Sequence, residues 1–379
     1  MSSISIAILG TRGVPARYGG FETFAAELGS RLAGRGHRVT VYCRNLARAD
    51  ELADGASDVW RGVRRLVLPA FRHKYLETVS HTALSAIDAL RRQYDVVLLC
   101  NAVNAFVLPL LRAARIPVAV NVDGIERRRR KWNALGKAVY AAGESLSAVF
   151  ADAVVADAHV IAGYYKERFQ IDAAMIPYGA ELADDGGSDV LDRLALRPRD
   201  YILYVSRFEP ENNPLEVVLA YETLVSHGAG IAVPPLVMLG DGLYAKDLVA
   251  ELMRHKSERV LFPGALYGAD YQTLQRNALV YVQATEVGGT HPALIEAMGS
   301  GGCVLAHDTP ENREVGGEAV RYFTLRPAET LSERLQECLR HPDNLDALRV
   351  QARERAARLY SWEVVTDGYE ALFHGLVRR

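Results

Sequence analysis

Short apolar runs alternate with longer amphipathic segments along nearly the whole chain. The first run covers residues 4–9. The apolar positions after it recur at helical spacing: Phe21, Phe24, Ala25, Leu28 and Leu32. The alternation then predicts strands at 38–43, 65–68, 95–100, 117–122, 153–156 and 174–177, with helices at 75–92, 105–114, 133–150 and 160–169. Strands that alternate with helices predict a parallel sheet covered on both faces.

A polar, glycine-bearing stretch at 181–199 interrupts this pattern and predicts a linker. The alternation then restarts, with strands expected at 201–205, 235–239, 259–262, 279–283 and 303–306. Residues 309–313 are expected to form a loop, and several helices finish the chain. A chain of 379 residues fits two domains. The pattern therefore predicts two α/β domains, at 1–182 and 198–359.

The composition mainly argues against certain features: a transmembrane helix, a signal peptide and a cysteine metal site. The chain has 49% apolar and 24% charged residues, as ordinary soluble globular proteins do. It contains no apolar run of about 18 residues, so no transmembrane helix is expected. The N-terminus leads straight into a strand without a charged region, so no signal peptide is expected. The four cysteines lie far apart with no CxxC spacing, which favours buried thiols in a reducing cytoplasm over a metal site.

The strand at 279–283 leads into a loop that contains Gly288 and Gly289, and a helix is expected from about His291. The N–H groups at a helix N-terminus attract phosphate, and glycines let the backbone approach it closely. Pro292 suits the first helical turn. Glu296 follows one turn later, within reach of a ribose hydroxyl. Taken alone, this Gly-Gly loop is equally an ordinary strand–helix turn.

A second glycine-rich loop, at 10–20, follows the first strand. Long loops at the carboxyl ends of strands are where α/β folds bind ligands. The GxGxxG spacing is absent, which argues against a nicotinamide cofactor.

Several motifs occur in order through the second half: Val205-Ser-Arg207, Glu209-Pro-Glu211-Asn-Asn213, Leu239-Gly-Asp241, and Glu286-Val-Gly-Gly-Thr-His-Pro-Ala-Leu-Ile-Glu296. They resemble the donor domain of retaining glycosyltransferase family 4. The loop at 10–24, together with Asn121-Val-Asp123-Gly-Ile-Glu126, resembles a narrower branch. That branch adds rhamnose to lipid-linked saccharides in the assembly of cell-surface polysaccharides.

The resemblance implies a GT-B fold, in which two doubly wound Rossmann-like domains face each other across a cleft. It implies a metal-independent hexosyltransferase that uses no cofactor. The expected donor is dTDP-rhamnose, and the expected acceptor is a lipid-diphosphate-linked saccharide. The terminal helix, at about 360–379, resembles the family's crossover segment, which returns to the N-terminal domain.

Carried over residue by residue, the resemblance gives Glu296 the nucleotide ribose and Arg207 the diphosphate. The family's first glutamate, eight positions before Glu296, is Gly288 here, and Glu286 lies ten positions before it. The usual spacing of the two glutamates is therefore broken, and the role of Glu286 stays open. Asn212 stands in place of the family's lysine, and Asp123 in place of a frequent histidine.

Asp123, Glu211 and Arg128 are the catalytic candidates. Asp123 would act on the acceptor hydroxyl, unless it caps a helix. Glu211 would contact the donor sugar, unless it caps the next helix. Asn212 replaces a lysine of the family, so one positive charge near the diphosphate is missing. Arg128, Arg12 or Arg17 would supply that charge instead.

The remaining candidates surround these three. The donor is expected at Arg207, Gly288, Gly289, Thr290, Glu296, Gly19, Gly20, Gly264 and Leu266. The acceptor is expected at Arg12, Arg17, Tyr18 and Glu22, although Glu22 also suits a helix first turn. No metal ligand is expected.

The charge is uneven: residues 1–190 hold 24 Lys and Arg against 20 Asp and Glu. The basic run at 127–131 ends at Trp132, and residues 71–76 form a similar patch. Such patches suit an anionic membrane surface, or else a solvated face. We expect a cytoplasmic enzyme, peripheral on the inner face of the plasma membrane, that does not bind nucleic acid. A UDP- or GDP-sugar transferase and a non-catalytic nucleotide-sugar-binding scaffold are the alternatives, and the acceptor, linkage and oligomeric state stay open.

Overall fold

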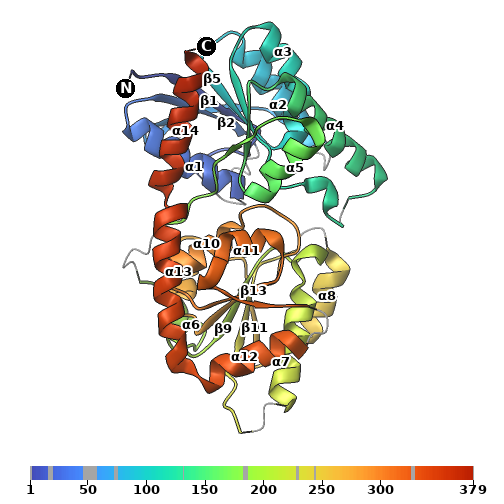
Figure 1. Cartoon of the computed structure of the whole chain (residues 1–379), viewed down its shortest axis with the longest axis vertical. Helices are drawn as coiled ribbons and strands as arrows, with labels where there is room; N and C mark the ends of the chain where they lie inside the picture. Colours follow the sequence, from blue (N-terminus) through green and yellow to red (C-terminus); the bar gives the residue numbers. More distant parts are fainter. Residues whose placement is uncertain are drawn as a thin grey trace. The chain divides into compact units, whose positions relative to one another are not determined.

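The computed structural model describes residues 2–15, 20–45, 58–71, 76–130, 132–181, 187–227, 230–242, 245–325 and 329–378. The chain forms two compact units (Figure 1). Unit 1 consists of residues 1–127, 132–178 and 362–379, and unit 2 of residues 128–131 and 179–361. The short segment 128–131 therefore belongs to unit 2, although unit 1 surrounds it in the sequence.

Unit 1 is built on an eight-stranded sheet of order β3-β4-β2-β1-β5-β6-β7-β8. All neighbours pair in parallel except β3 with β4 at the edge. The strands are β1 (Ser5–Leu9), β2 (Arg38–Arg44), β3 (Val59–Trp60), β4 (Val63–Leu68), β5 (Val96–Cys100), β6 (Val118–Asn121), β7 (Ala153–Ala156) and β8 (Ala174–Met175). The chain reverses its direction of strand addition between β1 and β5, and α/β folds bind ligands outside such a switch point.

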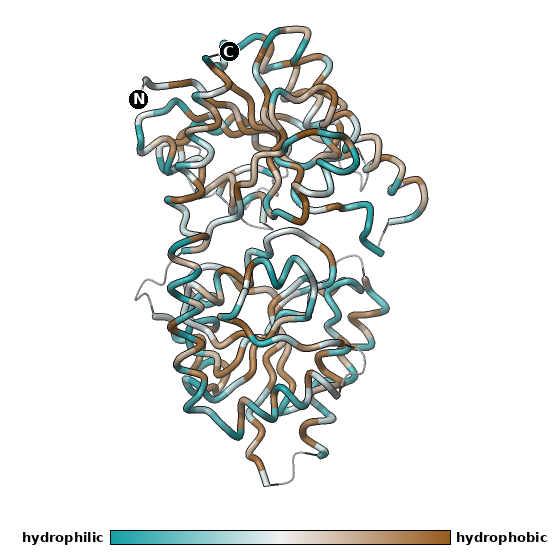
Figure 2. The backbone as a smooth tube through the Cα atoms, viewed as in Figure 1, coloured by the Kyte–Doolittle hydropathy of each residue, from teal (hydrophilic) through white to brown (hydrophobic). Residues whose placement is uncertain are grey.

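Helices cover both faces of this sheet, as the alternating pattern predicts. They are α1 (Gly20–Gly34), α2 (Leu76–Ala89), η1 (Ala102–Val107), α3 (Leu108–Ala113), η2 (Glu126–Arg128), α4 (Ala134–Phe150), α5 (His159–Phe169) and α14 (Trp362–Val377). The core between sheet and helices is aliphatic and includes Leu9, Leu99 and Val120. Hydrophobic residues predominate in the strands of both units (Figure 2).

Unit 2 has a six-stranded parallel sheet of order β11-β10-β9-β12-β13-β14. The strands are β9 (Ile202–Val205), β10 (Leu236–Leu239), β11 (Val260–Gly264), β12 (Val280–Gln283), β13 (Val304–His307) and β14 (Arg321–Phe323). The helices are α6 (Val190–Arg193), η3 (Pro210–Asn212), α7 (Pro214–His227), α8 (Lys246–Arg254), α9 (Gly268–Asn277), α10 (Pro292–Gly299), α11 (Pro310–Gly316), η4 (Gly317–Ala319), α12 (Glu329–Arg340), η5 (Pro342–Asn344) and α13 (Leu345–Tyr360). Its switch point lies between β9 and β12.

One local expectation is wrong. Residues 309–313 were expected to form a loop, but α11 begins at Pro310. The Thr309 side chain accepts a hydrogen bond from the Asn312 N–H, and proline occupies the first turn, so Thr-Pro is a helix start here. The short strands β3 and β14 were not predicted, because two or three residues are too few to show an alternation of apolar and polar positions.

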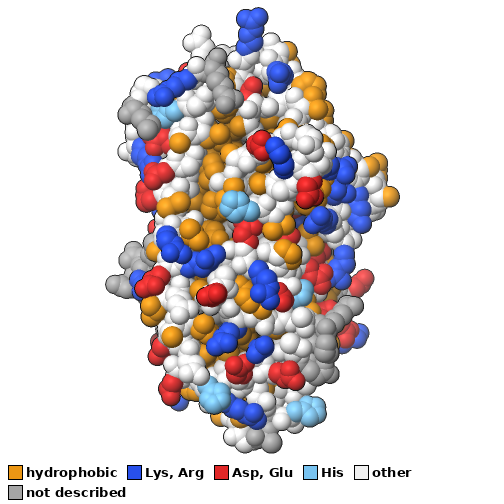
Figure 3. Space-filling model, in the orientation of Figure 1, with side chains coloured by type: hydrophobic (Ala, Val, Ile, Leu, Met, Phe, Trp, Pro, Cys, Tyr) orange, Lys and Arg blue, Asp and Glu red, His pale blue; other side chains and the backbone are white. Residues whose placement is uncertain are grey.

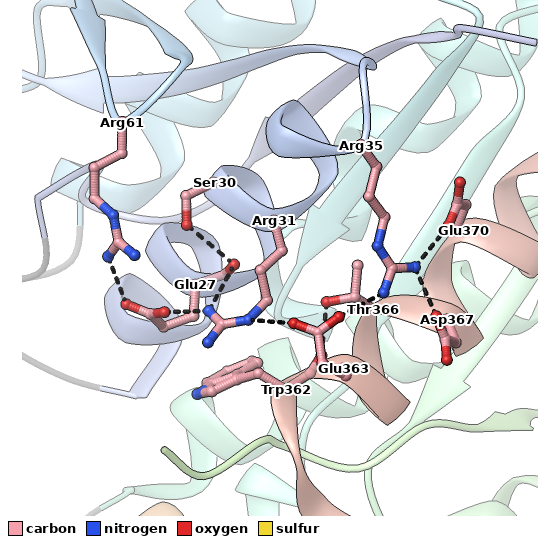
Figure 4. A network of polar contacts seen from close by, with 10 residues as sticks. All are labelled: Glu27, Ser30, Arg31, Arg35, Arg61, Trp362, Glu363, Thr366, Asp367 and Glu370. Atoms are coloured by element: carbon pink, nitrogen blue, oxygen red, sulfur yellow. Dashed lines mark hydrogen bonds and ion pairs between the residues drawn. The ribbon is translucent and has the colours of Figure 1, made fainter. Parts of the chain in front are cut away.

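The C-terminal helix α14 packs on α1 within unit 1. Arg31 of α1 and Arg35, which directly follows that helix, face the acids of α14 (Figure 4). Arg35 donates to Glu363 at 2.7 Å, Asp367 at 2.6 Å and Glu370 at 2.7 Å. Beneath these ion pairs the ring of Phe24 lies 5.3 Å from that of Tyr369. The last helix of the chain is therefore part of the first unit.

Replacing Trp362 with alanine is expected to destabilise unit 1 by about 3–5 kcal/mol, the usual cost of truncating a buried aromatic residue. Trp362 is buried, and Arg31 lies over its ring at 5.7 Å. Urea denaturation measures the change. Val364→Ala, on the exposed side of the same helix, serves as the control. Equal stability of the two variants would show that α14 is only loosely attached.

Candidate functional site

The loops after β9 and β12 flank the switch point of unit 2 and are joined by direct hydrogen bonds. The Glu286 N–H donates to the Glu211 carbonyl oxygen at 2.9 Å. The Asn213 side chain donates to the Ala284 carbonyl oxygen, also at 2.9 Å. The two sequence motifs Glu209–Asn213 and Glu286–Glu296 therefore meet at the carboxyl edge of the sheet, where the topology predicts a ligand site.

Glu211 lies at the centre of this site and is completely buried. Neither of its carboxylate oxygens accepts a hydrogen bond from the described residues. Its charge partner is Arg129, whose Nη1 lies 3.6 Å from Oε1. Arg129 is itself buried, with 8% of its surface exposed. A buried carboxylate normally accepts several hydrogen bonds, so the two oxygens of Glu211 have unused acceptor capacity among the described residues.

The His291 ring occupies the space that a side chain at position 288 would need, so only glycine fits there without a shift of the ring. A Cβ atom at position 288 would lie 2.3 Å from the His291 Cε1, closer than carbon atoms can approach. Burial and the nearby positive charge of Arg129 lower the pKa of His291 to about 3, so its imidazole is neutral at physiological pH. The ring of His291 thus fills the place where the family's first glutamate would begin.

Gly288→Ala is expected to destabilise the chain by roughly 1–3 kcal/mol, because the new methyl group must displace the His291 ring. The double variant Gly288→Ala/His291→Ala removes the clash. It should recover most of the loss relative to His291→Ala alone. Thermal unfolding of the four proteins gives the coupling free energy. Additive effects at the two positions would contradict the assignment.

Glu296 lies on α10, one turn after the glycine loop, and is half-buried. The Tyr271 hydroxyl of α9 donates to its Oε2 at 2.5 Å. Burial raises the pKa of Glu296, the hydrogen bond from Tyr271 lowers it, and the charge of Glu181 raises it again. The sequence places an acid near the helix start, and the structure adds the partner that orients it.

Arg207 and Asn212 lie in the loop after β9. The Arg207 side chain is exposed, and its carbonyl oxygen accepts a 2.7 Å hydrogen bond from the Asn212 side chain. Asn212 therefore shapes the loop that carries Arg207. Gly240 packs against the same loop, since a Cβ there would meet the Ser206 carbonyl oxygen at 1.8 Å. Gly264 ends β11 and Leu266 follows it, half-buried.

Two arginines of the basic run at 127–131 form hydrogen bonds with other residues of the chain. Arg127 donates to Glu144 and to the Tyr164 hydroxyl in unit 1. In unit 2, Arg130 donates to Glu286 at 2.7 Å and to the Pro210 carbonyl oxygen at 3.1 Å. Arg128, the candidate chosen from sequence, is exposed. Its neighbour Arg129, which the sequence did not single out, is the arginine buried beside Glu211.

In unit 1, Asp123 follows β6 and has a left-handed backbone, with φ of 56°. Its N–H donates to the Asn121 side chain, which in turn donates to the Tyr369 hydroxyl of α14 at 2.8 Å. Asp157 follows the neighbouring strand β7 and is buried. Strained backbone of this kind is concentrated at functional sites. The C-terminal helix thus helps to fix the backbone at Asp123.

The remaining candidates of unit 1 surround the loop after β1. Glu22 is buried in the first turn of α1, and its Oε1 accepts the Arg12 N–H at 2.9 Å. The Arg12 side chain lies 3.7 Å from Glu77. Gly20 begins α1 and is exposed. The candidates Arg17, Tyr18 and Gly19 lie outside the described residues.

Among the described residues, one group has the composition of a metal site: His37, Glu370 and His374 in unit 1. The His37 Nδ1 accepts the Ile4 N–H, so its proton resides on Nε2. That nitrogen lies 2.9 Å from Glu370 Oε1 and donates to it. His37 therefore has no lone pair directed at a cation, and the group is a hydrogen-bonded contact between the residue directly before β2 and α14.

Three residues of the unit 2 site were missed from sequence: Arg129, Tyr271 and His291. Arg129 lies in a basic run that favours a solvated face, and Tyr271 lies on a helix without a motif. For His291 a signal existed, because a histidine directly before Pro292 stands at the N-cap of a helix that follows two glycines. The conflict between its ring and a side chain at 288 is visible only in three dimensions.

Two family models match the chain. One, described as Glycosyltransferase Family 4, matches residues 18–184, and the other, Glycosyl transferases group 1, matches residues 193–356. The chain is a glycosyltransferase. Its two Rossmann-like units have the GT-B fold, and glycosyltransferases of these families use nucleotide sugars. No curated protein sequence matches it.

Several solved structures share the fold of this glycosyltransferase. Sucrose-phosphate synthase from Thermosynechococcus elongatus aligns with a TM-score of 0.81 at 20% identity, covering 98% of this chain and 99% of that one. Anabaena HepE in complex with UDP and glucose aligns at 0.78 and 16% identity, covering 98% and 100%. A trehalose-phosphate synthase from Burkholderia vietnamiensis aligns at 0.73 and 11% identity, covering 99% and 100%.

Proposed function

We propose that this glycosyltransferase moves L-rhamnose from dTDP-rhamnose, with retention, to a hydroxyl of a lipid-diphosphate-linked saccharide. The observation that carries the proposal is Glu211, a buried carboxylate with unoccupied oxygens at the switch point of unit 2. Its carboxylate would accept hydrogen bonds from the donor sugar. Its motif, Glu209-Pro-Glu211-Asn-Asn213, resembles that of the rhamnosyltransferase-like branch.

The rest of unit 2 suits a nucleotide diphosphate. The backbone N–H groups at Gly288, Gly289 and Thr290 lead into α10, whose N-terminus favours negative charge. Arg207 presents an exposed guanidinium on the adjacent loop. Preorganised dipoles and cations of this kind stabilise the charge that develops on the leaving diphosphate. Glu296 would hold the ribose, and main chain near Gly264 and Leu266 the base.

Unit 1 would supply the residues for the acceptor. Asp123 is held by its strained backbone and by the hydrogen bond to Asn121. Its carboxylate would position the acceptor hydroxyl or accept its proton. Glu22 and Arg12 would shape the loop beside it, and the candidates Arg17 and Tyr18 complete the acceptor set.

A membrane contact suits the outer face of α2, α3 and α4 in unit 1. These helices expose large apolar side chains: Leu76, Val79, Leu84, Ile87, Leu110, Leu135, Val139 and Val149. Their exposed charged residues are basic, namely Arg112 and Lys137, and their acids Glu77, Asp88 and Glu144 are at least partly buried. Hydrophobic and Lys or Arg side chains gather beside each other around α4 (Figure 3). Such faces bind anionic lipid surfaces.

No helix among the described residues is long and apolar enough to cross a membrane. From the exposed apolar and basic side chains of α2, α3 and α4 we propose peripheral attachment at the cytoplasmic face. In flotation with vesicles containing anionic lipid, the wild type should rise with the vesicles. Leu135→Ser/Val139→Ser should remain at the bottom, and Arg128→Ser, in the basic run, should behave as the wild type. Equal flotation of all three would place the lipid contact elsewhere.

A donor panel tests the proposed activity. Thermal shift with dTDP, UDP and GDP, followed by donor hydrolysis with dTDP-rhamnose and UDP-glucose, compares the alternatives. Preferential stabilisation by dTDP and turnover of dTDP-rhamnose are expected. UDP-glucose is the informative competitor, because HepE binds UDP and glucose. Stabilisation by no nucleotide would support the alternative of a non-catalytic scaffold.

A further inference from the structure

Asp123, the acceptor-site candidate of unit 1, is linked to the C-terminal helix by two consecutive hydrogen bonds. The Asp123 N–H donates to the Asn121 Oδ1 at 2.9 Å. The Asn121 Nδ2 in turn donates to the Tyr369 hydroxyl oxygen at 2.8 Å. Both bonds lie within unit 1, although Asn121 and Tyr369 are 248 residues apart in the sequence. One buried amide side chain therefore joins Asp123 to α14.

The sheet fixes the backbone at one end of this link. Asn121 ends β6, an interior strand, and its carbonyl oxygen accepts the Asn101 N–H at 2.8 Å. The Val122 N–H donates to the Val155 carbonyl oxygen at 3.0 Å. Asp123 follows directly and has a φ of 56°. A non-glycine residue in the left-handed region persists only where its surroundings hold it, and the Asn121 side chain does so at the Asp123 N–H.

The Tyr369 hydroxyl is not needed for the packing of its ring. The ring centroid lies 5.3 Å from that of Phe24 on α1 and 5.7 Å from that of Phe373 on α14. A phenylalanine would fill the same space. Tyr369 is completely buried, and a buried hydroxyl costs free energy unless it forms a hydrogen bond. The contact with Asn121 is therefore what a tyrosine adds at this position.

Tyr369 remains neutral in this environment. Burial raises the pKa of its hydroxyl well above the usual value, and the hydrogen bond from Asn121 lowers it only in part. The nearby acidic groups of Cys100, Asp157 and Asp123 add to the rise. A neutral phenol oxygen accepts a proton from an amide and keeps its own. The link between Tyr369 and Asn121 is thus formed by two uncharged groups.

We propose that Tyr369 is a positioning residue of the acceptor site, which acts through Asn121 to hold Asp123 in its left-handed conformation. The inference rests on the proposed function, in which the Asp123 carboxylate positions the acceptor hydroxyl or accepts its proton. Without the Tyr369 hydroxyl, the buried Asn121 Nδ2 loses its acceptor, and the amide is free to turn away from the Asp123 N–H. The C-terminal helix then has a role in the reaction in addition to its packing on α1.

Transfer from dTDP-rhamnose to a lipid-diphosphate-linked saccharide, with a separate titration of dTDP, measures this role. Tyr369→Phe should lower kcat by about tenfold to hundredfold, because small displacements of reacting groups slow a reaction by this much. Its dissociation constant for dTDP should equal that of the wild type, since the nucleotide is proposed to bind unit 2. In the Asn121→Ala and Asp123→Ala backgrounds, Tyr369→Phe should cause no further loss, because it acts through those two residues.

Tyr42→Phe is the matched control. Tyr42 is completely buried in the same unit, and its hydroxyl donates to the Asp88 carboxylate at 2.8 Å. The variant therefore also loses a hydrogen bond of a buried tyrosine, but one without a link to Asp123. It should keep the kcat of the wild type.

Amide hydrogen exchange tests the same link without any substrate. Mass spectrometry of peptides that cover residues 121–126 of the intact protein reports the Asp123 N–H. Tyr369→Phe should speed exchange there about tenfold or more, because the hydrogen bond to Asn121 opens more often. Tyr42→Phe should exchange at the rate of the wild type.

Three results would overturn the inference: unchanged exchange at Asp123 in Tyr369→Phe, a wild-type kcat for that variant, or an equal loss of kcat in the presence and absence of Asn121. If exchange accelerates as expected but Asp123→Ala transfers like the wild type, or the wild type transfers nothing, the proposed function fails and the positioning of Asp123 by Tyr369 stands. The two failures are thereby distinguished.

Discussion

Replacing Glu211 with glutamine is expected to lower kcat/KM by about 10²–10⁴-fold while nucleotide diphosphate binding changes little. The carboxylate is buried, and its oxygens are unoccupied among the described residues. Each hydrogen bond from a sugar hydroxyl to a charged group contributes about 1.5–3 kcal/mol, so the loss of one such bond, together with the weakening of a second that now goes to a neutral acceptor, falls within this range. The amide keeps the size of the side chain but offers only one acceptor oxygen.

Glu286→Gln is the matched control for this prediction. Glu286 lies in the neighbouring loop and pairs with Arg130, but that pair is far more exposed than Glu211. Exposed ion pairs contribute only about 0–1 kcal/mol, so its turnover should stay close to that of the wild type. Steady-state kinetics with separate titration of donor and of free nucleotide diphosphate measures both effects. A Glu211→Gln variant with wild-type turnover would remove Glu211 from the donor site.

Replacing Arg129 with methionine is expected to destabilise unit 2 by about 3–5 kcal/mol, because it leaves the buried Glu211 carboxylate without its charge partner. The double variant Arg129→Met/Glu211→Leu contains neither buried charge. Its stability should return close to that of the wild type, since replacing a buried ion pair with apolar residues is often neutral. Its turnover should remain as low as that of Glu211→Gln.

This separation of stability from activity identifies the pair. The wild type, Arg129→Met, Glu211→Leu and the double variant are compared. Urea denaturation gives the free energy of unfolding of each protein, and donor hydrolysis gives its turnover. A double variant that is no more stable than Arg129→Met would show that Arg129 stabilises unit 2 through other contacts. Recovered turnover in the double variant would show that the charge of Glu211 is not needed.

Most of the fold is predictable from sequence because each strand and helix has its own period. The βα alternation predicts both sheets. Residues 181–199 were predicted to form a linker, but unit 2 already begins at residue 179, and α6 (Val190–Arg193) lies within that stretch. The errors concern local signals that override the pattern. Thr309 and Pro310 start a helix where a loop was expected, and β3 and β14 are too short to show alternation.

The candidate site was predictable only where one continuous segment carries it. The glycine loop and Glu296 lie within a few residues of each other, and Glu211 lies in a recognisable motif. Arg129 was not predictable, because the segment 128–131 joins unit 2 only through tertiary contacts. The absence of a side chain at 288 likewise depends on the His291 ring. Residue pairs of this kind leave no periodic signal in a single sequence.

The most direct test of the proposed function is a transfer assay with purified protein. The chain is incubated with dTDP-rhamnose and a lipid-diphosphate-linked saccharide, and mass spectrometry follows the products. We expect release of dTDP together with a saccharide heavier by one deoxyhexose, with the initial rate of both products at least about a hundredfold lower for Glu211→Gln. Transfer from UDP-glucose but not from dTDP-rhamnose, or equal transfer by the Glu211→Gln variant, would contradict this account.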